Sequence, residues 1–444
     1  MGEADMTRQV RAARAGIMAC LALLLWAVAE ARAATEAELQ SAVFRAKPAV
    51  VMIGVEVGAT AAVRCGAEPA HTVRPAPLGW IGSGSILHPD GWVVTNGHVV
   101  QPFYEKNEAS FVPRLLEQAV AQACGPALEG LGGEARAQRI RTLAADPVNR
   151  GGITLEKKLT VNLSNGEMYP AEVKFYSPPA FVEVGIAKDA SGATRKEYGK
   201  DVAILKIPAR DLPVVRLARH STDLHLGQGL FVIGFPGVVA AHELLSQATR
   251  FEPSVTVGHV SSFKVDVGGH RVVQTDAAII QGNSGGPVFD YRGNVIGAAT
   301  FTSLQGDQVV QGFNFLIPVE TIHEAAQKAG VTPRGESAFT ALWNRGVDLY
   351  IQDLHYRAYR NMNAASKIHP GFPDVERVKE DCDIKHREQW YLHREEVQWG
   401  VMGFGGIAAV AGVWFGGRRA AAAGRRRIRQ LIREELQGAV PPQG

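Results

Sequence analysis

The sequence predicts a mainly β-stranded domain, followed by a helical segment and one membrane-spanning helix. Short apolar runs separated by turns fill residues 49–300, and many short strands at regular spacing are typical of barrels or a sandwich. After the linker Pro333-Arg334-Gly335 the apolar spacing becomes helical. Residues 399–417 then contain no charged side chain, which favours a membrane span.

Composition sets few limits on function. The chain has 444 residues, enough for two or three domains, with 46% hydrophobic and 20% charged residues. Its net charge is only +3, so no nucleic-acid partner is expected. No Cys/His cluster has metal-ligand spacing, so neither a metal ion nor another cofactor is expected.

The N-terminus has the pattern of a secretory signal over residues 1–33. Arg8, Arg11 and Arg14 precede the uncharged run Gly16–Ala29, which is short for a membrane span. Ala31-Arg32-Ala33 is a small-x-small site, so cleavage is expected before Ala34. An uncleaved anchor is the alternative, and both readings export the chain.

Export permits disulfides, and three cysteines lie outside the signal. Cys65 and Cys124 flank the segment around His98 and could pair, or could both be buried free thiols. Cys382 would then be free or joined to another molecule.

The expected strands are runs rich in β-branched and aromatic residues. The turn His88-Pro89-Asp90-Gly91 suits a type I turn, and Asn165-Gly166 is a hairpin signal. The expected runs are Val50–Val57, Gly84–Leu87, Trp92–Thr95, Leu159–Leu163, Val202–Ile207, Phe231–Gly234, Val255–Val260, Val272–Thr275 and Val295–Thr300.

Two insertions interrupt these runs. Residues 101–157 predict helices over Pro113–Cys124 and Glu134–Ala144, with the breaker Gly130–Gly133 between them. The second insertion is Ser177–Lys200, and loops of this size are usually functional or disordered. Val319–Ala329 predicts a short helix that ends at Gly330.

Residues 337–398 predict a helical stalk after the β domain, which itself is assigned to residues 34–332. The segment matches the small and large positions of one tetratricopeptide repeat, at Leu342, Gly346, Leu349, Ala358, Met362, Ala365 and Pro370. Asp374–Gln398 would be a further helix. The alternative is a plain helical hairpin without a peptide-binding role.

The predicted membrane helix covers residues 399–417, with Trp399, Trp414 and Phe415 near its ends. Seven arginines lie between Arg418 and Arg433, so residues 418–444 are expected to be a cytoplasmic tail. A row of small residues, Ala408, Gly412 and Gly416, could pair with another helix in a homo-oligomer. A glycine-rich buried core segment is the alternative.

Three polar residues are the parts of a nucleophilic triad in the order His98, Asp201, Ser284. A serine hydroxyl is nearly inert until a base such as histidine accepts its proton, and an aspartate orients that base. Ser284 lies in the glycine-rich segment Gln281–Pro287, whose N–H groups can face a developing oxyanion.

The segments Thr95–Val100, Asp201–Lys206 and Thr275–Pro287 resemble the three signature blocks of trypsin-like proteases of the bacterial HtrA/DegP type. Gly82–Ile86 and Gly312–Pro318 also fit this pattern. The resemblance covers residues 49–330 and implies two antiparallel β-barrels with the triad in the cleft between them. It implies a serine endopeptidase that cleaves exported or misfolded proteins through an acyl-enzyme, at the periplasmic face of a bacterial inner membrane.

The resemblance also assigns roles around the triad. The N–H groups of Gly282 and Ser284 would form the oxyanion hole. Alignment with the family motif puts Ala278 and Ile279 in the primary specificity pocket, with Thr300, Phe301 and Thr302 on the neighbouring strand. No acidic residue stands at the pocket base, so a small or medium apolar substrate side chain is expected.

The chain departs from the family pattern in three ways. Ile280-Gln281 replaces the usual Asn-Pro, His98 and Asp201 are 103 residues apart, and no PDZ-like region follows the protease. These departures weaken any inference about the family's regulation. The rival interpretation is a catalytically silent chaperone or scaffold on the same fold, and the intact triad argues against it.

Overall fold

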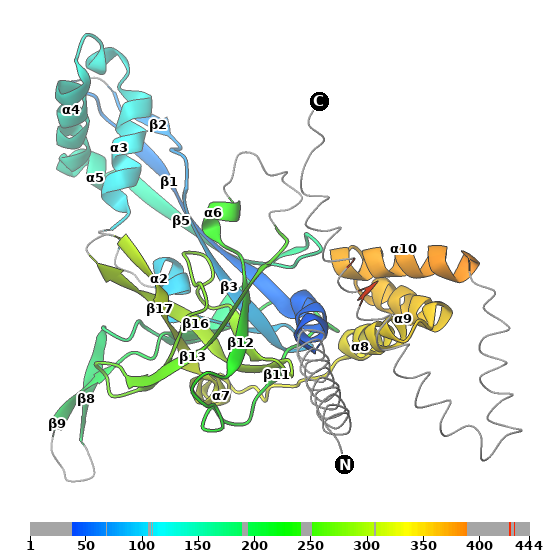
Figure 1. The fold of residues 1–444 in the computed structure, drawn as a ribbon. Coiled ribbons are helices and arrows are strands. Elements are labelled where there is room, and N and C mark those ends of the chain that lie inside the picture. The colour runs from blue at the N-terminus through cyan, green and yellow to red at the C-terminus, as the bar shows by residue number, and fades with distance from the viewer. Residues whose placement is uncertain are drawn as a thin grey trace, which may run out of the picture.

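The computed structural model describes residues 38–67, 69–104, 108, 110–188, 194–240, 251–305, 308–388, 426, 427 and 430. A helix over residues 38–46 and the short η1 (Lys47–Ala49) lead into the first of two β-sheets. Each sheet curls into a barrel, and the two barrels lie side by side (Figure 1). The trypsin-like barrel architecture implied by the resemblance is thus what the structure shows.

The first barrel has the strand order β6-β5-β1-β3-β4-β10-β7, with β2 paired to β1. Its two edge strands, β6 and β7, are separated by one residue, Ala171, so the edges meet. Its strands are β1 (Val50–Val63), β2 (His71–Val73), β3 (Leu78–His88), β4 (Trp92–Thr95), β5 (Ile153–Asn162), β6 (Met168–Pro170), β7 (Glu172–Ser177) and β10 (Val202–Lys206).

The second barrel is closed by hydrogen bonding, because β16 pairs with both β15 and β17 in the order β11-β16-β15-β12-β13-β14-β17. Its strands are β11 (Arg216–Leu217), β12 (Gly229–Gly234), β13 (Ser254–Val265), β14 (Arg271–Thr275), β15 (Pro287–Asp290), β16 (Asn294–Gln305) and β17 (Gln308–Pro318). The short α6 (Gly237–Ala240) follows β12. Each expected strand run falls on one of the strands of the two barrels.

The first insertion forms a helical cap at the outer end of β1, β2 and β5 (Figure 1). After α2 (Gly97–Tyr104) come α3 (Val112–Ala123), η2 (Pro126–Leu128), α4 (Gly133–Ala145) and α5 (Pro147–Gly151). The two expected helices are therefore confirmed as α3 and α4. Leu116, Val120, Leu128 and Leu143 form a small core there, separate from the cores of the barrels.

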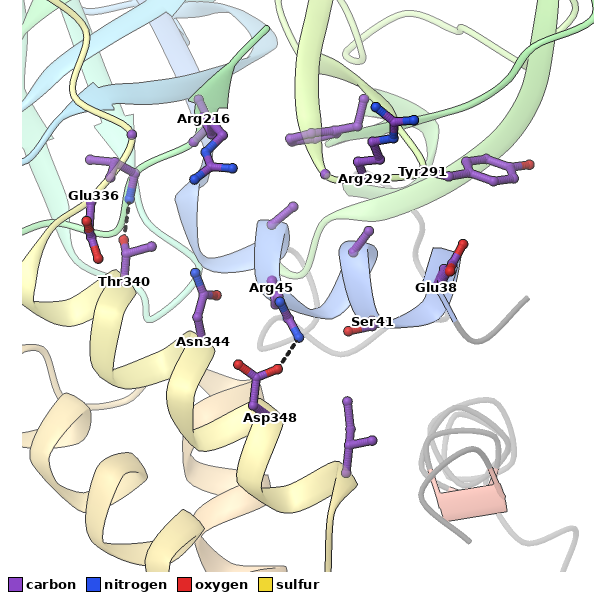
Figure 2. Close-up of a pocket in the computed structure, with 18 of the residues that line it drawn as sticks. Glu38, Ser41, Arg45, Arg216, Tyr291, Arg292, Glu336, Thr340, Asn344 and Asp348 are labelled. Atoms are coloured by element: carbon purple, nitrogen blue, oxygen red, sulfur yellow. Dashed lines mark hydrogen bonds and ion pairs between the residues drawn. The ribbon is translucent and has the colours of Figure 1, made fainter. Parts of the chain in front are cut away.

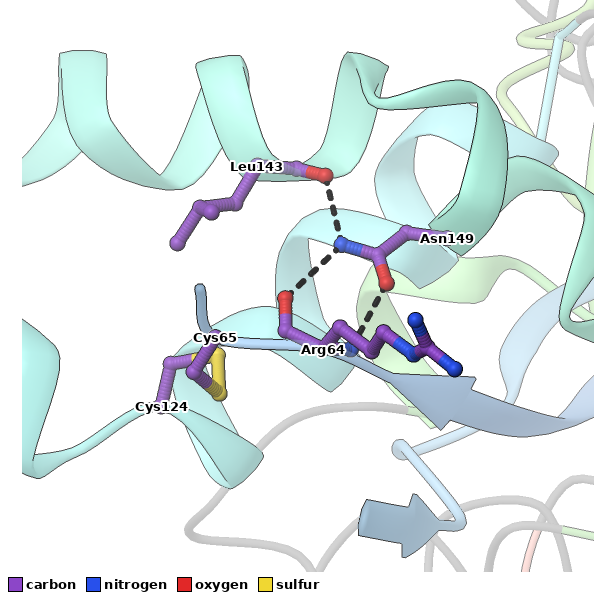
Figure 3. Close-up of a disulfide and its surroundings, with 5 residues drawn as sticks. All are labelled: Arg64, Cys65, Cys124, Leu143 and Asn149. Carbon is purple, nitrogen blue, oxygen red and sulfur yellow. Dashed lines mark hydrogen bonds between the residues drawn. A yellow bond between two sulfur atoms is a disulfide. The ribbon is translucent and has the colours of Figure 1, made fainter. Parts of the chain in front are cut away.

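Cys65 and Cys124 form a disulfide, with their Cα atoms 5.4 Å apart, which decides a pairing that the sequence left open. The bond ties the end of β1 to the end of α3 (Figure 3). Beside it, the buried Asn149 side chain accepts from Arg64 N at 2.7 Å and donates to Leu143 O at 2.9 Å. The cap is thus fixed to β1 by one covalent bond and a buried amide.

The second insertion is a β-hairpin of β8 (Glu183–Lys188) and β9 (Thr194–Tyr198). Its polar, charged sequence gave no strand signal. The hairpin begins and ends beside the candidate aspartate, because Asp201 N donates to Pro178 O at 2.9 Å.

The C-terminal helices are α7 (Val319–Lys328), α8 (Ala338–Ile351), α9 (His355–Ile368) and α10 (Pro373–Glu388). Ser337 caps α8 by accepting from Thr340 N at 3.0 Å. Gly346 allows α8 and α9 to cross closely, since a Cβ there would lie 2.6 Å from the Cε of Met362. The expected pair of helices is confirmed. Of the expected third helix, Asp374–Gln398, α10 covers the part up to Glu388, and residues 389–398 lie outside the described residues.

The helical unit α8–α10 is not the free stalk that the sequence suggested. Trp343 and Met362 belong to the same buried cluster as Val51 and Ile53 of the first barrel. Phe44 connects the two parts, with its ring centroid 5.2 Å from that of Trp343. The stalk expectation failed because helical spacing identifies an apolar face but not the surface that covers it.

Polar contacts support the same docking. Lys47 Nζ, with its side chain only 9% exposed, lies 3.2 Å from Asp374 of α10. His369 donates from Nε2 to Arg210 O at 2.8 Å. Val214 N donates to Thr340 Oγ1 at 3.0 Å. The helical unit is therefore docked on the first barrel through η1 and the segment that follows β10.

A cavity of about 1240 Å³ lies where the helix of residues 38–46, the turn after β15 and α8 meet. Arg45 and Asp348 form an ion pair across it, and Arg216, Arg292 and Glu336 line the same space (Figure 2). Its lining mixes both charges, so the cavity has no single electrostatic preference.

The predicted signal (1–33) and membrane helix (399–417) lie outside the described residues. Within the described part of the chain, no helix is both long enough and apolar enough to cross a membrane. Of the basic tail, Arg427 is described, and it forms an ion pair with Asp353 between α8 and α9.

Candidate active site

The turn that carries Ser284 depends on two glycines with left-handed backbone angles. Gly282 has φ +100° and Gly285 has φ +84°. A Cβ on Gly285 would lie 2.2 Å from Ser83 O, and one on Gly282 would lie 2.4 Å from Phe235 O. No other residue type fits either position, which explains the glycines of the motif.

Every carbonyl of this turn from Gln281 to Ser284 has a donor. Gly237 N donates to Gln281 O at 2.8 Å, and Gly286 N donates to Asn283 O at 2.9 Å. The Gln281 carbonyl shares a peptide group with the Gly282 N–H, and the Asn283 carbonyl shares one with the Ser284 N–H. In a trans peptide the C=O and N–H point in opposite directions, so both N–H groups point away from these donors. Neither N–H donates a hydrogen bond within the described chain.

His98 and Asp201 come together through the pairing of two strands. His98 follows β4 at the start of α2, and Asp201 directly precedes β10; the register pairs Thr95 with Ala203. His98 Nδ1 lies 2.9 Å from Asp201 Oδ2, and His98 N donates to Oδ1 at 2.9 Å. The two insertions between His98 and Asp201, which are 103 residues apart in sequence, leave this geometry intact.

Asp201 is held by further polar groups in an almost fully buried site. Thr300 Oγ1 donates to its Oδ2, and Asn96 Nδ2 donates to its backbone oxygen at 2.9 Å. The backbone of Asp201 also has φ +50°, an angle that is uncommon for residues other than glycine. These constraints fix the direction of the carboxylate toward His98.

The two groups stabilise each other's charged forms. Burial alone would raise the pKa of Asp201, but the hydrogen bond and charge of His98, with Thr300 Oγ1, hold this pKa below its ordinary value. Burial would lower the pKa of His98, but the hydrogen bond and charge of Asp201 raise it above 6.5. The carboxylate is therefore ionised at neutral pH and ready to stabilise an imidazolium.

Ser284 Oγ donates to Thr300 O at 3.2 Å rather than to His98. In structures without substrate, the hydrogen bond between nucleophile and base is often long or absent. Ser284 belongs to the second barrel, and His98 and Asp201 belong to the first. Thr300, which binds both Ser284 and Asp201, thus connects the candidate nucleophile to the His98–Asp201 pair at the junction of the barrels.

The residues assigned to the specificity pocket have different surroundings. Ala278 is exposed, whereas Ile279 is 2% exposed and packs in the core of the second barrel with Val273 and Leu316. Thr300 is buried against Asp201. Phe301 and Thr302 continue β16, but their side chains lie outside the described part.

Sequence reasoning gave no role to the buried Asn96 and Ser83, and it assigned the buried Thr300 to substrate binding rather than to the support of Asp201. Asn96 binds Asp201, Thr300 binds both Asp201 and Ser284, and Ser83 binds the serine turn. The sequence signal that could have identified Ser83 is a polar side chain within a run that otherwise reads as a buried strand, Leu78–His88. Among the described residues, no His, Cys, Asp or Glu cluster is arranged to hold a metal ion.

Comparison with known proteins supports the fold. The profile of the trypsin-like peptidase domain matches residues 82–297, which contain all three candidate residues. The fold is that of a trypsin-like peptidase. The match begins within β3 and ends within β16, and so spans both barrels.

Curated relatives match this chain over stretches of 151 to 240 residues. The serine protease HhoB of Synechocystis is 37% identical over 151 residues, covering 32% of this chain and 32% of the relative. A DegP-like periplasmic serine endoprotease of Ectopseudomonas mendocina is 32% identical over 240 residues, covering 50% and 47%. The serine protease HTR4 of Rattus norvegicus is 31% identical over 233 residues, covering 50% and 38%. This chain therefore spans between a third and a half of the length of these relatives.

Among solved structures, the HtrA-type protease AlgW with a decapeptide matches over 66% of this chain and 67% of its own, at 21% identity and a TM-score of 0.37. That similarity is too loose to bear on function.

Proposed function

We propose that the protein is a serine endopeptidase that uses Ser284, His98 and Asp201. The observation that carries this proposal is the serine turn, which leaves the N–H groups of Gly282 and Ser284 free beside an ordered His98–Asp201 pair. In a protein that only binds its partner, two backbone N–H groups without an acceptor, next to a nucleophile and its base, would serve no purpose.

The reaction follows from the orientation of the imidazole. Asp201 holds His98 through Nδ1, so Nδ1 carries the proton and Nε2 is the base. Ser284 Oγ leaves Thr300 O, gives its proton to Nε2 and bonds to the substrate carbonyl carbon. The negative carbonyl oxygen accepts from the N–H groups of Gly282 and Ser284.

His98 then returns the proton to the leaving amine, and the peptide C–N bond breaks to leave an acyl-enzyme. Water gives a proton to Nε2 and attacks the ester, and the proton returns to Ser284 Oγ when the acid product leaves. Loss of one oxyanion donor typically costs about 3–4 kcal/mol of barrier, so the turn contributes as much as the base.

The substrates are proposed to be polypeptides with a small or medium apolar residue before the scissile bond, taken from exported or misfolded proteins. The exposed Ala278 and the neighbouring β16 support this class, since neither presents a charged side chain to the substrate position. An extended substrate would pair through main-chain hydrogen bonds with residues 300–302 of β16, which lie beyond the stretch that pairs with β15.

The decisive experiment compares Ser284→Ala and His98→Ala with the parent protein. Both variants are expected to lose labelling by a fluorophosphonate probe and hydrolysis of peptides, while circular dichroism stays unchanged. His225→Ala is the matched control, because that histidine is exposed and lies outside the site. Hydrolysis that survives both changes contradicts the proposal, and a folded parent protein without labelling favours the silent scaffold.

We further propose that residues 399–417 tether the enzyme to a bacterial inner membrane with the barrels on the periplasmic side. The uncharged run and the arginines after it support this arrangement. In a tethered molecule the Arg427–Asp353 ion pair is absent, because about 30 Å of hydrocarbon separates the two residues. Labelling of probe cysteines in intact cells is expected at Gly335 and not at Gln443; labelling at both positions contradicts the tether.

A further inference from the structure

Ser83 is a fully buried serine of β3, in the first barrel, that contacts the serine turn of the second barrel. Its Oγ donates to Gly282 O at 2.6 Å and accepts from Phe235 N at 2.8 Å. Its N donates to Ser284 O at 2.8 Å. One residue thus binds two of the four carbonyls that shape the turn.

We propose that Ser83 is a positioning residue for the oxyanion hole, acting through the hydrogen bond from its hydroxyl to Gly282 O. The inference rests on the proposed peptidase function. The first barrel, which supplies the base, then also holds the N–H groups of the other barrel in place.

The need for such an anchor follows from the glycine. Gly282 adopts φ +100°, and glycine has no Cβ to exclude alternative angles. The peptide on its N-terminal side carries the free N–H, and the peptide on its C-terminal side carries the carbonyl bound by Ser83. With both neighbouring carbonyls held, by Gly237 N and by Ser83 Oγ, the Gly282 N–H has a fixed direction.

The same hydroxyl also fixes the strand behind the turn. Phe235 directly follows β12, and its N–H donates to Ser83 Oγ. Two residues later, Gly237 N donates to Gln281 O, the other carbonyl beside Gly282. Loss of the hydroxyl therefore loosens both anchors of Gly282 together. The triad residues His98 and Asp201 are not bonded to Ser83, so their geometry stays unchanged.

The strand provides a matched control two residues away. Ser85 also lies in β3 and is 1% exposed, but its Oγ has no hydrogen-bond partner among the described residues. Ser83→Ala and Ser85→Ala remove the same atom from the same strand. Only Ser83→Ala breaks hydrogen bonds to the turn.

The test measures kcat and KM on a short peptide substrate, per active site titrated with a fluorophosphonate. Ser83→Ala is expected to lower kcat about 10- to 100-fold with KM nearly unchanged, because a broken buried hydrogen bond typically costs about 1–3 kcal/mol. The inhibition constant of a peptide boronic acid, whose tetrahedral adduct occupies the oxyanion hole, is expected to rise by the same factor. Ser85→Ala is expected to match the parent protein in all three measurements.

If Ser83 only stabilised the fold, Ser83→Ala would reduce the number of active sites that the fluorophosphonate titrates. The value of kcat per titrated site and the inhibition constant of the boronic acid would then stay unchanged. Ser83→Cys, which keeps a weak donor, is expected to fall between the parent and Ser83→Ala, and it serves if Ser83→Ala does not fold. Parent-like kcat and inhibition constant in the folded variant overturn the inference. A parent protein that neither labels nor cleaves would instead overturn the proposed function.

Discussion

Loss of the Cys65–Cys124 disulfide should unfold the helical cap while leaving the barrels folded. The bond closes a loop of 59 residues. The chain-entropy model gives about 4 kcal/mol for a loop of that length, which is an upper value because reduced chains retain some structure. The cap has its own small core around Leu116 and Leu143, separate from the cores of the barrels, so this loss falls on the cap.

Hydrogen exchange on the double variant Cys65→Ser/Cys124→Ser measures this effect. Exchange in α3 and α4 is expected to become up to about a thousandfold faster, since each 1.4 kcal/mol is a factor of ten. Exchange in β12 and β15, and hydrolysis of small peptides, should stay as in the parent. Unchanged protection of the cap, or equal loss of protection in both barrels, would refute the reasoning.

The remaining predictions concern the base and the helical unit. The value of kcat/KM should rise with pH along a limb whose midpoint lies above 6.5, because neutral His98 is the active form and Asp201 raises its pKa; a midpoint below 6.5 in a pH–rate profile contradicts this. A chain that ends at Gly330 should be insoluble or lack a cooperative melt, because it uncovers the core shared with α8–α10; a folded, active product would show that the helices are dispensable. Phe44→Ala should lower the free energy of unfolding by about 3–5 kcal/mol, measured in urea, since its ring packs on Trp343; a loss below about 1 kcal/mol would show that this contact is unimportant. Ala358→Leu should cost about 1–3 kcal/mol and lower the single melting transition of the whole protein; two separate transitions would restore the idea of an independent stalk.

The sequence predicted the elements whose signals are local. Apolar runs marked strands of both barrels, although β1 continues to Val63, beyond the expected Val57, because β2 and β5 pair with it there. The breaker at Gly130–Gly133 correctly separated α3 from α4. Gly346 and Met362 marked a true helix crossing.

The parts that could not be predicted depend on contacts between distant segments. The hairpin β8–β9 leaves apolar residues of β8 exposed, such as Ile186 at 69%, so no pattern of burial marks its strands. The docking of α8–α10 on the first barrel depends on surface shape. The same holds at the site: the motif indicated Ser284, His98 and Asp201, but the anchor role of Ser83 needed the register of two barrels.

The core shared by the first barrel and the C-terminal helices also governs timing during synthesis. Its buried members run from Phe44 to Cys382, nearly the full length of the described chain. A ribosome releases Phe44 long before Cys382, so a nascent chain holds an incomplete first barrel until its last helices emerge. The first barrel can therefore reach its final packing only after α10 has been made, which places the completion of this core at the end of synthesis of the described chain.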